Sequence, residues 1–235
     1  MGTRKSKDAE ATVINMTLFR NRTDAGQQLA HKLSRYAQKP NVIVLALPRG
    51  GVPVGFEIAQ ALQVPLDIFL VRKLGVPGQE ELAMGAIASG DIEVLNQDIV
   101  QSLHIPRHII EAIKAKEAAV IQQRNTLYRK NYPPLPIKNK TVILVDDGVA
   151  TGATLRAAIA AIRQLGCSRL IVAIPLAPES TYHELKQELD EIECLATPEP
   201  FFAIGNWYHH FPQTSDEEVC ALIAANRSQP FINPV

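Results

Sequence analysis

The sequence has little cysteine, few aromatic residues and no long hydrophobic run. Its cysteines, Cys167, Cys194 and Cys220, lie far apart and form no Cys-x-x-Cys pair. This spacing argues against a disulfide framework or a zinc site and is typical of thiols in a reducing cytosol. No run of about 18 apolar residues occurs, and the polar N-terminus lacks the apolar core of a signal peptide. We therefore expect a cytoplasmic protein with no membrane partner.

The sequence also lacks an excess of either charge, because 24 lysines and arginines balance 24 aspartates and glutamates. Nucleic acids and anionic membranes attract basic proteins, so this balance gives no support to a nucleic-acid partner. A chain of 235 residues is long enough for one α/β domain with a substantial core. We predict a disordered polar tail over residues 1–12 and a single domain over residues 13–235.

The most informative stretch begins at Val142. Four apolar residues predict a buried strand that ends at Asp146 and Asp147, and a glycine-bearing loop then leads into a helix that Gly166 ends. The unpaired N–H groups at such a helix start suit a phosphate. Two adjacent carboxylates would repel a bare phosphate, but they accept hydrogen bonds from a diol. A ribose 5-phosphate satisfies both requirements.

The stretch Val142 to Thr154 resembles the phosphoribosyl-pyrophosphate (PRPP) binding motif of type I phosphoribosyltransferases. The resemblance implies that Asp146 and Asp147 hold the 2- and 3-hydroxyls of the ribose. An ordinary strand-turn-helix with solvated aspartates is one alternative, and a receiver-type phosphoacceptor pair is another. The residues expected to hold the 5-phosphate are Ala150, Thr151, Gly152, Ala153 and Thr154, and Gly148 is a further expected substrate-binding residue.

A second strand-loop-helix begins at Val42 to Leu47 and continues through Pro-Arg-Gly-Gly. Arg49 offers a forked, permanently charged donor, and the glycines let the backbone approach a phosphate closely. Tight packing alone is the alternative role for such glycines. In the resembling family the equivalent loop holds the pyrophosphate, often through a non-proline cis peptide. Here that bond would join Arg49 to Gly50, and Gly50 would contact the pyrophosphate.

The third expected strand, Leu66 to Val71, is followed by a mobile Gly/Pro loop over residues 74–81 and by hairpin arms over 83–88 and 92–95. Type I phosphoribosyltransferases carry a flexible loop in this part of the chain that closes over the pyrophosphate. The resemblance therefore makes Lys73 a charge partner for the pyrophosphate. Glu80 and Glu81 are candidates to approach the incoming base, with solvated loop charges as the alternative.

Strand and helix patterns alternate through the remaining chain, which predicts an α/β fold with a mostly parallel central sheet flanked by helices. Ligands in such sheets bind at the carboxyl ends of strands, where both loops are expected. We predict a helical excursion over about 96–130, packed on the domain or on another copy in a homo-oligomer, and a small C-terminal hood over about 197–235. Arg20 and Arg22, just before a helix expected over 23–38, are placed to meet substrate or solvent.

The C-terminal part carries most clues to the acceptor. Phe202-Ala-Ile-Gly205 resembles the segment after the last core strand of hypoxanthine-guanine phosphoribosyltransferases, where an aromatic ring stacks on the purine. Phe202 is thus the candidate base-stacking residue, with packing of the hood as the alternative role. His209 and His210 lie where those enzymes have an acidic, metal-linked residue, but paired histidines are more often surface residues. We assign no protein side chain to a metal.

The resemblance points to transfer of the ribose 5-phosphate of PRPP to a nitrogenous base, with release of pyrophosphate. Asp146, Asp147, Arg49 and Lys73 form the expected catalytic set, and Mg²⁺ would be bound mainly through the pyrophosphate and water. Ala150 replaces an aspartate that hypoxanthine-guanine enzymes use on the purine, so the base is left open. A non-catalytic regulator that senses PRPP is the alternative function.

Overall fold

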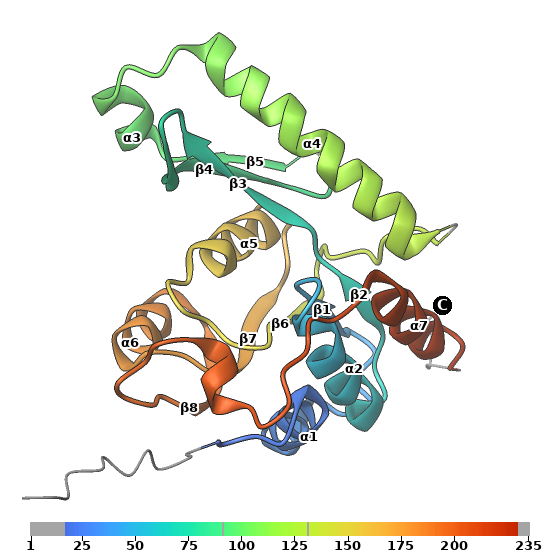
Figure 1. Cartoon of the computed structure of the whole chain (residues 1–235). Coiled ribbons are helices and arrows are strands. Elements are labelled where there is room, and N and C mark those ends of the chain that lie inside the picture. Colours follow the sequence, from blue (N-terminus) through green and yellow to red (C-terminus); the bar gives the residue numbers. More distant parts are fainter. Residues whose placement is uncertain (1–16, 91, 131, 230–235) are drawn as a thin grey trace, which may run out of the picture.

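The computed structural model describes residues 17–90, 92–130 and 132–229, so the tail expected over 1–12 lies outside the described residues. A five-stranded parallel sheet in the order β2-β1-β6-β7-β8 forms its centre (Figure 1). Parallel strands are covered on both faces, which explains why every residue of β1 and β6 is buried and why all of them except Thr141 are apolar. The five strands are β1 (Val42–Ala46), β2 (Leu66–Ile68), β6 (Thr141–Val145), β7 (Arg169–Leu176) and β8 (Glu191–Ala196).

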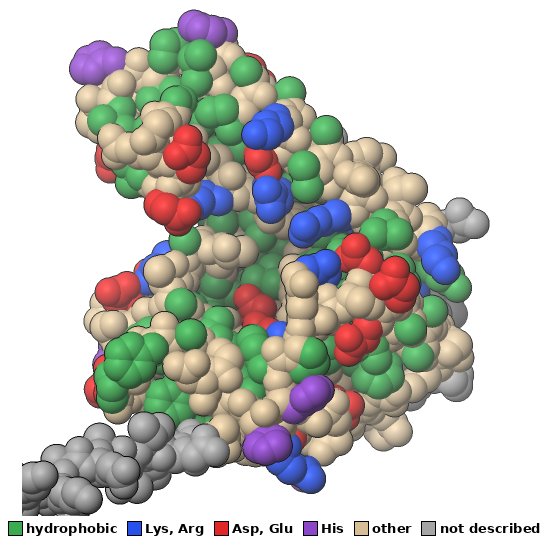
Figure 2. Space-filling view, in the orientation of Figure 1, with side chains coloured by type: hydrophobic (Ala, Val, Ile, Leu, Met, Phe, Trp, Pro, Cys, Tyr) green, Lys and Arg blue, Asp and Glu red, His purple; other side chains and the backbone are tan. Residues whose placement is uncertain are grey.

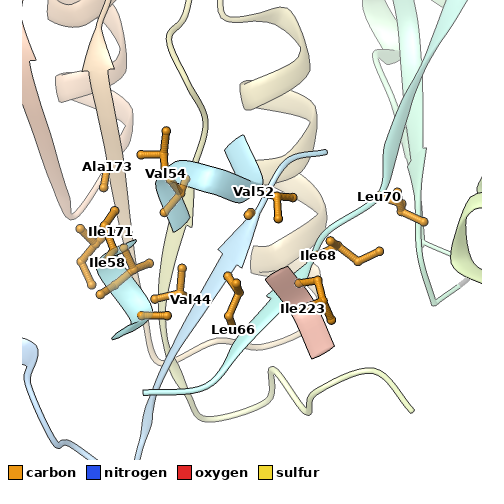
Figure 3. Close-up of a cluster of buried hydrophobic side chains, with 14 of the residues drawn as sticks. Val44, Val52, Val54, Ile58, Leu66, Ile68, Leu70, Ile171, Ala173 and Ile223 are labelled. Atoms are coloured by element: carbon orange, nitrogen blue, oxygen red, sulfur yellow. The ribbon is translucent and has the colours of Figure 1, made fainter. Parts of the chain in front are cut away.

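Helices cover both faces of this sheet, as predicted. One face carries α1 (Arg22–Lys32), α2 (Gly51–Leu62) and α7 (Asp216–Arg227), and the other carries α5 (Ala153–Gln164) and α6 (Glu179–Glu188). Figure 3 shows the first face, where Val44 and Leu66 of the sheet meet Ile58 of α2 and Ile223 of α7. Single 3₁₀ turns lie at Ser34–Tyr36 and Ile204–Trp207.

Residues 71–130 leave the central sheet and form a second body, which we call the excursion. It holds an antiparallel sheet of β3 (Val71–Val76), β4 (Gln79–Ala88) and β5 (Ile92–Leu95), followed by α3 (Gln97–Ser102) and α4 (Arg107–Arg129). The long helix α4 lies along β3 and ends beside α7 (Figure 1). Among the described helices, none combines the length and the apolar character needed to span a membrane.

Two predictions for the start of the excursion are wrong. The strand expected over Leu66 to Val71 is two strands in different sheets, β2 and β3. The expected loop over 74–81 lies almost entirely in β3 and β4, with Pro77 and Gly78 as the turn. Gly75 permits this pairing, because a Cβ there would lie 2.6 Å from the carbonyl oxygen of Glu80. The glycines and proline therefore shape a hairpin instead of interrupting it.

A buried ion-pair network fastens α4 to the central sheet. Asp67 of β2 has only 1% of its surface exposed, and its carboxylate lies 3.0 Å from Nε of Arg129, the last residue of α4. Nη2 of Arg227, at the end of α7, lies 3.3 Å from the same carboxylate. Removing one member of such a network leaves a buried charge unpaired, which is strongly unfavourable. The C-terminal end of α4 is thereby held against the sheet.

Candidate functional site

The two predicted loops meet at the carboxyl ends of β1 and β6. These strands pair in parallel, with Ala46 opposite Val145, so the chain leaves both at the same edge. The backbone of Gly50 in the first loop lies against the carboxylate of Asp147 in the second. A Cβ on Gly50 would lie only 2.0 Å from Oδ2 of Asp147. Only glycine fits there without moving the carboxylate. The non-proline cis peptide joins Pro48 to Arg49, not Arg49 to Gly50 as expected. Gly50 has helical backbone angles and is the N-cap of α2.

Asp147 of the acidic pair is buried, and Asp146 is half-buried. Asp147 has 9% of its surface exposed, and its backbone N–H donates to Oδ1 of Asp146 at 2.9 Å. Burial raises the pKa of both carboxyls. The charge of Asp147 raises the pKa of Asp146 further, while Arg22 opposes the increase in the pKa of Asp147. Two carboxylates held in this way favour a ligand that brings hydroxyl donors or a cation.

Arg22, the first residue of α1, forms an ion pair with Asp147. Its Nε lies 2.7 Å from Oδ2 of Asp147, and its Nη1 donates to the carbonyl of Pro212 at 2.7 Å. The guanidinium also stacks 3.7 Å from the ring centroid of Phe211. The hydroxyl of Tyr208 donates to the backbone carbonyl of Asp147 at 2.7 Å. One of the two alternatives for Arg22, a solvated arginine, is thus wrong, although no local pattern distinguished Arg22 from Arg20.

The loop from Gly148 to Gly152 delivers the start of α5 to the same edge. Gly148 and Gly152 have φ of 153° and 75°, values that favour glycine. Thr151 and Thr154 are exposed, so their hydroxyls and the first N–H groups of α5 are open to a ligand. Ala150 and Ala153 are exposed as well, and the carbonyl of Ala150 accepts a hydrogen bond from Thr181. The geometry matches a phosphate-binding helix start.

Three predicted residues lie farther from the acidic pair. Arg49 is partly buried at the start of α2, with Nη1 3.7 Å from Oδ1 of Asp216 on α7. Lys73 of β3 donates to the carbonyl and the carboxylate of Glu81 on β4, both at 3.1 Å. Phe202 follows β8 and is 79% exposed. Other candidates named from the sequence are also exposed: Glu80, Glu81, His209 and His210.

A small cavity of about 30 Å³ joins the two loops to the excursion. Pro48 of the first loop and Thr154 of α5 line it, together with Arg72 of β3 and Arg124 of α4. Neighbouring strand residues point to opposite faces, so Arg72 faces this cavity while Lys73 meets Glu81. Figure 2 shows a hollow between the excursion and the sheet, with Lys and Arg side chains along it.

Arg124 was not predicted from the sequence. It belongs to a helix with a long charged face, and helical spacing alone does not show which of those charges turns toward the loops. Arg72 is the neighbour of Lys73 in the sequence, but only Lys73 was predicted to bind the pyrophosphate. Successive side chains of a strand point to opposite faces, which would have shown that Arg72 and Lys73 face different ways. This rule could be applied only once the boundaries of β3 were known.

Comparison with known proteins identifies the family of this chain. The family model described as phosphoribosyl transferase domain matches residues 93–205. A Mycobacterium tuberculosis H37Rv protein, Rv0571c, named provisionally as a phosphoribosyl transferase, is 45% identical over 208 residues, covering 88% of this chain and 47% of its own. The bifunctional protein PyrR of Pelotomaculum thermopropionicum is 31% identical over 101 residues, covering 43% of this chain and 50% of its own.

The crystal structure of TT1426 from Thermus thermophilus is 38% identical, with a TM-score of 0.80, and the match covers 88% of this chain and 98% of that one. The chain belongs to the phosphoribosyltransferase family, as predicted from the motif at Val142 to Thr154. It spans about half the length of the curated relatives it matches.

Proposed function

We propose that the protein transfers the ribose 5-phosphate of PRPP to a nitrogenous base in the cytoplasm and releases pyrophosphate. The observation that carries this proposal is the contact between Gly50 and Asp147, which joins a diol-binding acidic pair to a second phosphate-type loop. A site for ribose 5-phosphate alone would need only Asp146, Asp147 and the loop before α5. The second loop provides for a further phosphate group on the sugar.

In this reaction a base nitrogen attacks the anomeric carbon while the bond from that carbon to the pyrophosphate oxygen breaks. By analogy with glycosidic cleavage, the sugar passes through an oxocarbenium-like state. The carboxylates of Asp146 and Asp147 stabilise its positive charge and orient the hydroxyls. The start of α5, with Thr151 and Thr154, holds the 5-phosphate. Arg49 and Lys73 neutralise the departing pyrophosphate, as assigned from the sequence.

A divalent cation fits this site only with help from the substrate. Among the residues that the structure describes, no group of three His, Cys, Asp or Glu side chains could hold a metal. Mg²⁺ would therefore be bound mainly through pyrophosphate oxygens and water, while Asp146 and Asp147 hold the ribose hydroxyls. When bound, it would offset the negative charge of the pyrophosphate.

The test combines Asp146→Asn with Asp147→Asn and measures magnesium-dependent release of pyrophosphate from PRPP across a panel of nucleobases. We expect release to fall at least a hundredfold, because the variant loses both charges that stabilise the cationic sugar. Asp98→Asn, an exposed position on α3, is the matched control and should behave like the wild type. Undiminished release by the double variant would contradict the assignment.

The same panel separates catalysis from regulation. Nucleotide formed in step with pyrophosphate identifies the acceptor base. Saturable binding of PRPP with no product from any base would instead identify a PRPP-sensing regulator, the alternative that the resemblance leaves open. Binding measured by calorimetry and turnover measured with labelled PRPP should be recorded on the same preparation, so that the two outcomes are not confused.

A further inference from the structure

We propose that Arg124 of α4 binds the pyrophosphate group of the donor, so that the excursion forms one wall of the substrate site. The inference rests on the proposed function and extends it to a helix that lies outside the central sheet. Its basis is the position of Arg124, which shares a cavity with Pro48 and Thr154, one residue from each of the two phosphate-type loops.

The charge of Arg124 is the first argument. Nearby cations already have partners: Arg72 lies 2.6 Å from the carboxylate of Glu117, and Arg49 lies 3.7 Å from that of Asp216. Within the described residues Arg124 makes no ion pair or side-chain hydrogen bond, although its side chain is partly buried. A partly buried guanidinium without an ion-pair partner is free to bind an anion, so this position favours an anionic ligand.

The rigidity of the support is the second argument. One turn beyond Arg124, the hydroxyl of Tyr128 donates to Oδ1 of Asp216 at 2.5 Å, and burial together with this bond raises the pKa of Tyr128 to about 12. At the end of the same helix, Arg129 is buried against Asp67. These two contacts hold the last turns of α4 against α7 and β2. Arg124 is therefore presented by a fixed helix and not by a loop.

The size of the cavity restricts what it can receive. About 30 Å³ accommodates roughly one water-sized group, and most of the lining residues are apolar, so we place the diphosphate at the mouth of the cavity, beside Arg124 and Thr154. The planar guanidinium of Arg124 suits paired oxygens of such a group. Thr154, in the first turn of α5, lines the same cavity. The diphosphate is then held between α4 and the two loops.

The experiment measures binding of three probes by calorimetry: inorganic pyrophosphate, ribose 5-phosphate and PRPP. We expect Arg124→Ala to weaken pyrophosphate and PRPP binding at least tenfold and to leave ribose 5-phosphate binding within twofold. Arg124→Lys should restore part of the lost affinity, since it returns the charge without the fork. Lys116→Ala, at an exposed position of the same helix, is the matched control and should bind all three probes like the wild type.

Equal binding of pyrophosphate by the wild type and Arg124→Ala overturns the inference, as does an equal loss for pyrophosphate and ribose 5-phosphate. No binding of pyrophosphate by the wild type overturns it as well. If Arg124→Ala fails to fold, Arg124→Gln replaces it under the same criteria. Failure of the proposed function is distinguishable, because the wild type would then form no nucleotide from any base, whereas the comparison of pyrophosphate and ribose 5-phosphate binding requires no turnover.

Discussion

Nε of Arg22 lies 2.7 Å from Oδ2 of Asp147, across 125 positions of sequence. Both side chains are mostly buried, with 11% and 12% of their surface exposed. The same guanidinium bonds to Pro212 and stacks on Phe211, so the acidic pair and the C-terminal segment share one support. One oxygen of Asp147 is thus engaged within the protein, whereas the carboxylate of Asp146 accepts a hydrogen bond from the backbone N–H of its neighbour.

Arg22→Ala is expected to lower the free energy of unfolding by about 2 to 4 kcal/mol, because it leaves the carboxylate of Asp147 buried without its cation. Urea denaturation measures this change. Arg20→Ala is the matched control: its side chain is 81% exposed, and its pair with Asp24 should contribute less than about 1 kcal/mol. Equal stability of the two variants would show that Arg22 and Asp147 do not interact strongly in solution.

Asp146→Asn is expected to stabilise the ligand-free protein at neutral pH. Burial, assisted by the charge of Asp147, raises the pKa of Asp146, so the folded protein keeps this proton to higher pH than the unfolded chain does. Stability is then greatest below the unfolded pKa of about 4 and falls as pH rises through the folded pKa. Asparagine does not ionise, so the Asp146→Asn variant does not lose this stability as the pH rises.

The measurement is urea denaturation of the wild type and Asp146→Asn from pH 4 to pH 8. We expect the two to be similar in stability at the acid end and the variant to be more stable by roughly 1 to 2 kcal/mol at pH 7. A constant difference across this range would refute the assignment of the elevated pKa to Asp146.

Gly50→Ala tests the contact between the two loops. The backbone angles of Gly50 are compatible with alanine, but the new Cβ would meet Oδ2 of Asp147 at 2.0 Å and displace the carboxylate. We expect PRPP binding to weaken at least tenfold, measured by calorimetry, with a folded circular dichroism spectrum retained. Unchanged affinity would mean that the position of Asp147 does not matter to the donor.

Phe202→Ala tests the predicted stacking residue. A ring that is 79% exposed contributes little to folding, so the thermal midpoint should hardly change. If Phe202 stacks on the acceptor, KM for the base should rise about fivefold or more, since stacking of one base is worth about 1 to 3 kcal/mol. KM for PRPP should stay constant. Leu103→Ala, an exposed apolar residue of the excursion, is the control and should alter neither KM.

Much of the central sheet could be predicted, because buried parallel strands are continuous apolar runs between turn residues. The strands at Val42 and Val142 and the glycine that ends α5 are where the pattern places them. The region from Leu66 to Glu81 was misjudged for a physical reason. Its apolar run passes from one sheet into another, and its glycines allow close strand pairing, which local propensity does not distinguish from a loop.

The sequence by itself determined the family, since the motif from Asp146 through Thr154 is contiguous and needs only a strand, a turn and a helix start. Only the tertiary structure decided what surrounds the motif. Arg22 and Tyr208 reach Asp147 from distant segments, and Arg124 reaches the phosphate loops from the excursion. Local spacing specifies which residues share a helix face, but long-range packing selects the surface that this face meets.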